Sequence, residues 1–165
     1  MDVFVYGSLT EPAQVRELLD SFAFVGAATL RGLCVVEGEY PTLAPPEPVE
    51  GDRDRPGDDD GDRTSDDGVG DDAARGIAAV GGRLLRTDEM ATLDEYERVD
   101  DGLYTRVSVP LCSPDGDPEG EVAVYVGDPG RLGAGAVWPG AGAFPDRVRH
   151  AVADAGVTVH RRPER

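Results

Sequence analysis

One acidic side chain, that of Glu97, lies on the apolar face of a helix expected between Arg86 and Leu103. Because a helix advances about 100° per residue, Leu93 lies at about 300° from Met90 and Glu97 at about 340°. A carboxylate in this position finds a hydrogen-bond donor, lies at the fraying helix end, or is held in a cleft that raises its pKa. In a cleft, Glu97 could act as a general acid or base.

Other acidic residues of this helix have simpler expected roles. Asp94 and Glu95 are expected to point further outward, and Asp88 and Glu89 suit the helix dipole if Thr87 opens the helix. The plain alternative for the carboxylate on the apolar face is a side chain that bends from the helix C-terminus into water.

A second feature is the segment YGSL at residues 6–9, a tight turn between an expected first strand and first helix. It does not fit a phosphate-binding loop, because no second or third glycine follows at the required spacing and the chain has no Lys. A plain strand-to-helix turn is the structural alternative to a binding role.

Short strands and a few helices must position these residues. In the first expected helix, Val15, Leu18, Leu19 and Phe22 share one face, with Thr10 as the cap and a proline in the first turn. A final helix is expected at 143–155. The expected strands are 3–6, 24–30, 33–37, 76–86, 104–112, 121–126 and a short one at 157–160. More strands than helices, with few βα alternations, predict an α+β fold with a mixed or barrel-like sheet in a single domain.

The segment 49–76 differs in composition from the rest of the chain. It is rich in Asp, Gly and Arg and contains almost nothing apolar, so we expect a solvated, mobile loop inserted into the domain. The stretch DDDGD within it suggests a calcium loop, but the ordered ligand spacing and the terminal Glu of such loops are absent.

The charge of the chain is extreme for 165 residues. The net charge is -17, and all sixteen cations are Arg. Acidic excess without Lys, with small apolar residues and 6% aromatics, favours a protein from a salt-rich cytosol, although an ordinary acidic protein is the alternative. Either interpretation argues against nucleic acid or an anionic membrane as a partner.

The charge leads to a first prediction, that stability rises with salt over the molar range. At 1 M salt the Debye length is about 3 Å, so repulsion between carboxylates that lie further apart than this is largely screened. The measurement is the melting temperature between low and multimolar KCl. A melting temperature that is flat or falls over this range would contradict adaptation to salt.

Cysteine count and hydropathy give weaker indications. Cys34 and Cys112 lie in apolar runs and are expected to be buried thiols, although a single bridge between them stays open. The first residues do not resemble a signal peptide and no window of eighteen residues is apolar, so we expect a cytoplasmic protein.

Three motifs together resemble one known family. They are YGSL at 6–9, YPTLAP at 40–45 and LDEYE followed by GLYTRVSV within 93–109. In this order and spacing, between about residues 2 and 126, they resemble the γ-glutamylcyclotransferase-like family, which includes the AIG2-like proteins. The resemblance implies a small mixed β-barrel with two to three flanking helices. Its known enzymes convert a γ-glutamyl amine or amide into 5-oxoproline and a free amine without metal or cofactor.

The resemblance also implies roles for particular residues. The catalytic Glu of the family is the second acid of its LDxxE stretch, which is Glu97 here. The substrate-binding positions that match are Tyr6, Gly7, Ser8 and Leu9 in the turn, and Tyr104, Arg106 and Tyr125 near the cavity. In the family, main-chain amides of the turn receive the polar end of the γ-glutamyl group, helped by the following helix N-terminus.

The implied chemistry needs one carboxyl group. The α-amine of the substrate loses a proton as it attacks its own γ-carbonyl, and the leaving amine gains one, so a single carboxylate can serve both nitrogens. No covalent enzyme intermediate is needed, because the nucleophile is already in the substrate. The expected partner is therefore a small molecule with a γ-glutamyl group.

Two departures from the family leave alternatives open. Arg98 stands where many members carry Gly, and Trp138 in AVWPGAG only partly matches the family's C-terminal segment, so it is a pocket wall or core. The alternative to an enzyme is a non-catalytic binding or regulatory module of the same fold.

Overall fold

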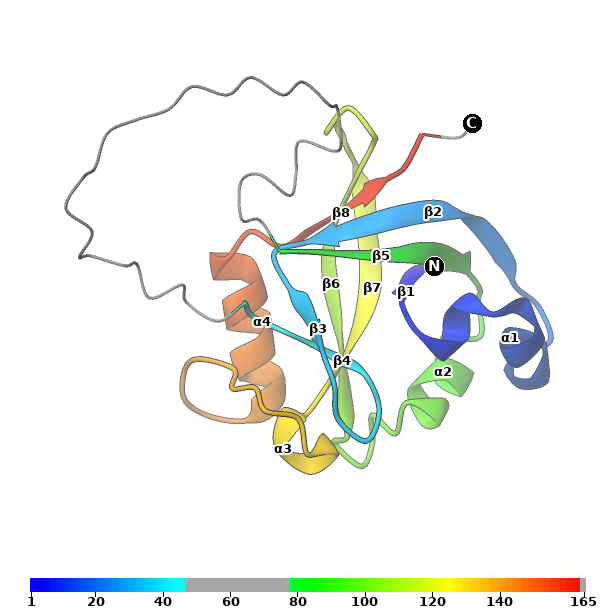
Figure 1. Ribbon diagram of the computed structural model, residues 1–165. Coiled ribbons are helices and arrows are strands. Elements are labelled where there is room, and N and C mark those ends of the chain that lie inside the picture. Colours follow the sequence, from blue (N-terminus) through cyan, green and yellow to red (C-terminus); the bar gives the residue numbers. More distant parts are fainter. Residues whose placement is uncertain (47–77, 164–165) are drawn as a thin grey trace, which may run out of the picture. The chain divides into compact units, whose positions relative to one another are not determined.

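Six strands close into a barrel in the computed structural model, which describes residues 1–46 and 78–163 (Figure 1). In order around the barrel they are β1 (Asp2–Val5), β5 (Ala79–Arg86), β2 (Ala23–Arg31), β8 (Thr158–Arg161), β6 (Tyr104–Cys112) and β7 (Pro118–Gly127). The pairs β1–β7 and β6–β8 are parallel, and the other pairs are antiparallel. The expected mixed barrel is thereby confirmed.

The remaining elements surround this barrel. A separate sheet pairs β3 (Cys34–Val36) with β4 (Thr42–Ala44). The helices are the 3₁₀ turn η1 (Ser8–Thr10), α1 (Pro12–Leu18), α2 (Met90–Tyr96), α3 (Pro129–Leu132) and α4 (Phe144–Asp154). The expected acidic insertion at 49–76 lies outside the described residues, and its insertion into a single domain stays a prediction.

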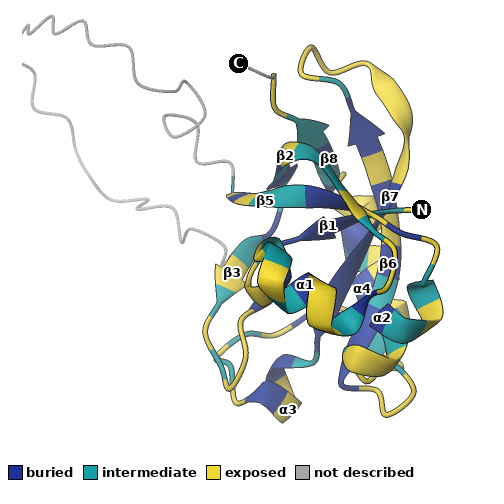
Figure 2. Cartoon of the chain, turned by 90° about the vertical axis from the view of Figure 1, so that its right-hand side faces the viewer, coloured by how far each residue is buried: buried dark blue, intermediate teal, exposed yellow. Residues whose placement is uncertain are grey.

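Both faces of strand β1 are buried. Phe4 belongs to the cluster that continues to α4 and includes Trp138, while Val3 and Val5 belong to a second cluster with Val15 of α1 and Leu93 of α2. Alternation along a strand sends successive side chains to opposite faces, so a strand covered on both sides needs an unbroken apolar run. Figure 2 shows the resulting distribution, with buried strands and exposed outer faces on the helices.

Two helix starts differ from the expected ones. Thr10 does not cap α1, because Glu11 takes the N-cap position and the Thr10 hydroxyl donates to the Gly7 carbonyl instead. Helix α2 begins only at Met90, because the Thr87 hydroxyl accepts from the Glu89 amide at 3.1 Å before the helix starts. Short side chains that bond to nearby backbone compete with helix formation in this way.

Two short elements were not expected. Strand β4 lies within the YPTLAP motif, and α3 follows β7 directly. The sequence does contain the signals for α3, since the Asp128 carboxylate accepts from the Gly130 amide at 3.0 Å, Pro129 is in the first turn, and Gly133 ends the helix with a φ of 66°.

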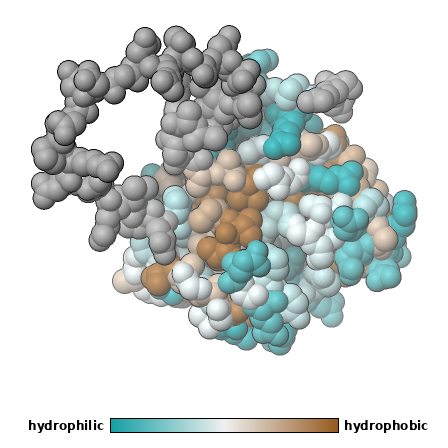
Figure 3. Space-filling model, in the orientation of Figure 1, coloured by the Kyte–Doolittle hydropathy of each residue, from teal (hydrophilic) through white to brown (hydrophobic). Residues whose placement is uncertain are grey.

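Other expectations are settled by the packing of the described residues. Cys34 and Cys112 are free cysteines; Cys112 is buried as expected, whereas Cys34 is partly exposed. Trp138 is core, only 2% exposed. Within residues 1–46 and 78–163, no helix is long and apolar enough to cross a membrane. Figure 3 shows hydrophobic residues near the middle of one face, surrounded by hydrophilic ones.

Candidate active site

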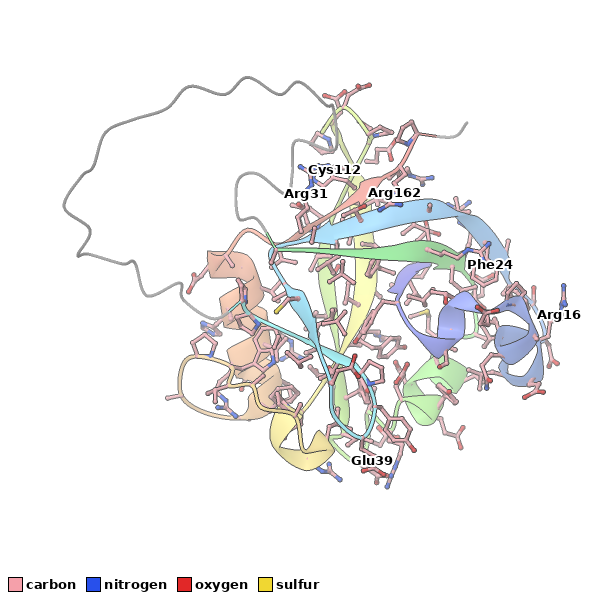
Figure 4. All side chains as sticks on the ribbon, in the orientation of Figure 1. Arg16, Phe24, Arg31, Glu39, Cys112 and Arg162 are labelled. Carbon is pink, nitrogen blue, oxygen red and sulfur yellow. The ribbon has the colours of Figure 1, made fainter. Side chains whose placement is uncertain are left out.

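A cavity of about 540 Å³ lies where β1 and β7 end and β6 begins. Parallel pairing of Phe4 with Val124 brings the end of β1 beside the end of β7, and antiparallel pairing sets Tyr104 opposite Gly127. Figure 4 labels Glu39 on the loop between β3 and β4, which lies away from Cys112 at the far end of the barrel. The lining residues are Phe4, Val5, Tyr6, Gly7, Ser8, Leu9, Gln14, Tyr40, Pro41, Tyr96, Glu97, Arg98, Leu103, Tyr104 and Tyr125. The volume suits a small molecule.

Glu97, at the C-terminal end of α2, lines this cavity. Its backbone amide still donates to the Leu93 carbonyl at 2.9 Å, and Leu93 is fully buried beneath it. Among the described residues, the carboxyl group has no hydrogen bond or ion pair, and burial raises its pKa to about 7. Two of the alternatives left open by the sequence therefore hold together: Glu97 lies at the helix end and in a cleft.

The backbone after Glu97 forms a Schellman motif. The Val99 amide donates to the Asp94 carbonyl at 2.9 Å, the Arg98 amide donates to the Glu95 carbonyl at 3.1 Å, and Arg98 has a φ of 54°. Arg98 is the one non-glycine residue with positive φ among the described residues. The left-handed conformation of Arg98 gives a physical reason for the Gly that many members of the γ-glutamylcyclotransferase-like family carry at this position.

We predict that Arg98→Gly stabilises the protein by about 0.5 to 1 kcal/mol. Relief of left-handed strain outweighs the extra entropy of Gly and the loss of the exposed ion pair with Asp101. The expected rise in melting temperature is roughly 2 °C. The control is Arg98→Ala, which removes the same ion pair but keeps the strain. Equal stabilisation by Ala would exclude strain as the cause.

The hydroxyl groups of three tyrosines in the cavity donate hydrogen bonds to other groups of the protein. Tyr6 donates to the Tyr125 carbonyl at 2.9 Å, Tyr104 to the Pro41 carbonyl at 3.2 Å, and Tyr125 to an Asp94 carboxylate oxygen at 2.7 Å. Burial raises the pKa of Tyr104 to about 12 and raises the pKa values of Tyr6 and Tyr125 as well. The phenols are therefore neutral near pH 7, and their oxygens can still accept hydrogen bonds from a ligand.

All four residues of the turn at 6–9 line the cavity. Gly7 has φ 134° and ψ -138°, a conformation close to the region that only glycine populates readily. The amides of Gly7, Ser8 and Leu9 have no hydrogen-bond acceptor among the described residues. The turn is held by Arg83, which donates to the Thr10 carbonyl at 2.9 Å. These amides are the available donors for an anionic ligand group.

Arg83 itself is fixed by an aromatic ring. Its guanidinium carbon lies 3.8 Å from the ring centroid of Phe24, which Figure 4 labels near α1. This cation–π contact orients the donor that holds the turn.

The expectation that Asp94 points outward is wrong. Its carboxylate accepts from the Tyr125 hydroxyl and lies 3.0 Å from a guanidinium nitrogen of Arg106. Arg106 and Tyr125 are directly paired on β6 and β7, so their side chains share a sheet face and hold one carboxylate of α2. The structure does not bring Arg106 into the cavity lining; the other residues proposed from the sequence all line it.

Sequence reasoning missed several lining residues. Tyr40 and Pro41 belong to the YPTLAP motif but had no assigned role, and Tyr96 and Gln14 come from α2 and α1. A tyrosine count is a signal that could have found two of them, because all five tyrosines of the chain line this cavity.

We predict that Glu97→Gln becomes increasingly more stable than wild type as pH rises from about 4.5 to about 7. The pKa of Glu97 in the folded protein is raised above its ordinary value of 4.5, so ionisation in this window favours the unfolded chain. Gln avoids this loss. The gap in unfolding free energy should widen by about 1 to 3 kcal/mol, measured by denaturant unfolding at pH 4 and pH 8. An unchanged gap would contradict the raised pKa.

Comparison with known proteins supplies independent similarities. The family model described as gamma-glutamyl cyclotransferase, AIG2-like, matches residues 3–55, which include the turn and Tyr40 but end before Glu97. No curated protein matches the chain.

Solved structures extend the similarity over more of the chain. An uncharacterized Homo sapiens protein matches with a TM-score of 0.53 and 16% identity over 77% of this chain. A gamma-glutamyl cyclotransferase matches with a TM-score of 0.50 and 18% identity over 78% of it. The chain spans 66% of the length of each of these two. An Arabidopsis thaliana protein has a TM-score of 0.48 and 23% identity, covering 93% of this chain and 83% of its own.

Proposed function

Because residues 3–55 match the family model described as gamma-glutamyl cyclotransferase, AIG2-like, we propose that the chain converts a γ-glutamyl amine or amide into 5-oxoproline and a free amine. Glu97 is the general acid and base of this reaction. The observation that carries the proposal is its carboxyl group, which lines the cavity without a partner among the described residues and has a pKa raised by burial to about 7.

Charge and hydrogen bonding set the orientation of the γ-glutamyl group. Its α-carboxylate accepts from the open amides at Gly7, Ser8 and Leu9, since these are donors without acceptors among the described residues. Its α-amine approaches the phenol oxygens, which have given their own protons to other acceptors. This orientation brings the amine and the γ-carbonyl into the cavity with Glu97.

The reaction needs no group other than the substrate and one carboxyl. The ionised Glu97 carboxylate removes a proton from the α-amine as its nitrogen forms a bond to the γ-carbonyl carbon. The amide C–N bond then breaks, the electron pair stays on the leaving nitrogen, and Glu97 returns the proton to it. A pKa of about 7 suits both steps, because each protonation state is well populated at neutral pH.

The test is incubation with a panel of γ-glutamyl amines, γ-glutamyl peptides and glutathione at low and multimolar salt, with 5-oxoproline as the readout. Release of 5-oxoproline from one class supports the proposal. If a γ-glutamyl compound binds without turnover, the protein is a binding module of the same fold. If none binds, both interpretations are wrong.

A further inference from the structure

The five tyrosines of the cavity divide into two groups. Tyr6, Tyr104 and Tyr125 are the inner ones, of which Tyr104 is 8% and Tyr125 3% exposed. Tyr40 and Tyr96 also line the cavity, but they are 56% and 41% exposed. An aromatic side chain this exposed contributes little to the core, so the rings form an uncovered rim at the cavity mouth.

The rim tyrosines, Tyr40 and Tyr96, line the same cavity as the three inner tyrosines. Burial raises the pKa of Tyr104 most, and the charges of Glu97, Tyr40 and Tyr96, which line the same cavity, raise it further. The hydroxyls of Tyr40 and Tyr96 have no hydrogen-bond partner among the described residues. Tyr96 directly precedes Glu97, and Tyr40 comes from the loop between β3 and β4, so two separate elements supply the rim.

The other mouth residues also suit a planar ring. Pro41 adds an apolar surface beside Tyr40, and Arg98 is the one cation among the lining residues. Among the described residues, its guanidinium is bound only through Nε to the exposed Asp101, at 3.1 Å, which leaves the other guanidinium nitrogens for a ligand. Tyrosine faces and a guanidinium plane all bind aromatic rings favourably.

We propose that the amine portion of the substrate carries an aromatic ring, which binds at the mouth against Tyr40 and Tyr96. This inference rests on the proposed function. The γ-glutamyl end occupies the inner cavity, so the leaving nitrogen lies at Glu97 and its substituent extends past the neighbouring Tyr96 toward solvent. The rim thereby selects the amine, while the inner cavity selects the γ-glutamyl group.

The experiment compares kcat/KM for three γ-glutamyl amides, those of benzylamine, cyclohexylmethylamine and ethylamine, in wild type and variants. In wild type the benzylamide is preferred. Tyr40→Ala should lower the benzylamide-to-ethylamide ratio by about 3- to 10-fold, the worth of one aromatic contact, and Tyr40→Phe should retain it. Comparing ratios between proteins cancels the different basicities of the amines. The control Val137→Ala alters a residue that is 82% exposed and outside the cavity lining, and it should change nothing.

Each remaining outcome decides the inference. If Tyr40→Ala leaves the benzylamide-to-ethylamide ratio of kcat/KM unchanged, the inference is wrong. It is also wrong if this variant lowers kcat/KM for the cyclohexylmethylamide as much as for the benzylamide, because that result indicates apolar rather than aromatic binding. Turnover without aromatic preference overturns the inference alone. If none of these amides is turned over and the wider panel of γ-glutamyl compounds releases no 5-oxoproline either, the proposed function fails. Calorimetric affinities of the same amides then give the same comparison of ratios.

Discussion

Glu97→Gln is expected to lower 5-oxoproline release by about 10²- to 10⁴-fold at saturating γ-glutamyl amide, the usual loss when general acid–base assistance is removed. Gln keeps the size and hydrogen-bonding shape of the side chain but cannot take and return a proton. Binding of the amide, measured by calorimetry, should persist. This variant therefore separates recognition from chemistry.

The matched control is Glu95→Gln, two residues earlier on α2. Glu95 is exposed and does not line the cavity, so its variant should stay within a few-fold of wild type. If wild type turns over and Glu97→Gln does so equally well, the assignment of the catalytic residue is wrong. The same variant should be the more stable protein above pH 7, so a loss of activity is not a loss of fold.

Asp94→Ala is expected to lower kcat by about 10- to 100-fold with a smaller effect on KM. Asp94 ties α2 to the Tyr125 hydroxyl and to Arg106, three residues before Glu97 on the same helix. Without it, the catalytic carboxyl group is held less well, and small misplacements of a catalytic group cost up to about 10²-fold. Steady-state kinetics give the split between kcat and KM.

Two further variants show whether Asp94 acts by position. Asp94→Asn keeps an oxygen that can accept from Tyr125 and should restore part of kcat. Asp146→Ala removes another carboxylate, which pairs with Arg149 on the surface of α4, and should leave turnover unchanged. Equal losses in Asp94→Asn and Asp94→Ala would mean that the ion pair with Arg106, rather than the hydrogen bond, orders the helix.

Helix geometry alone does not predict the tertiary contacts of Asp94. An angle around the helix axis separates the apolar face from the rest, but it does not say where a second sheet face meets the helix. Asp94 lies at the edge of the buried face, and the paired Arg106 and Tyr125 of β6 and β7 reach it there. Only the packing of α2 on these strands makes it an internal side chain.

The sequence by itself determined most of the strands and the face of the helix on which Glu97 lies. Strand β6 has the expected bounds, and Glu97 was placed beside Leu93 by the period of the helix alone. The family motifs then pointed to the turn at 6–9. The strand bounds and the helix face were predictable because they depend on neighbours in the chain, whereas the binding role of the turn stays a prediction.

Only the tertiary structure decided how distant segments meet. Parallel pairing of β1 with β7 brings Tyr6 to Tyr125, and the loop between β3 and β4 supplies Tyr40 to the mouth of the same cavity. The raised pKa of Glu97 likewise comes from burial in the folded protein, which no spacing along the chain encodes. Local periodicity fixes which face a residue occupies, whereas closure of the barrel decides what that face touches.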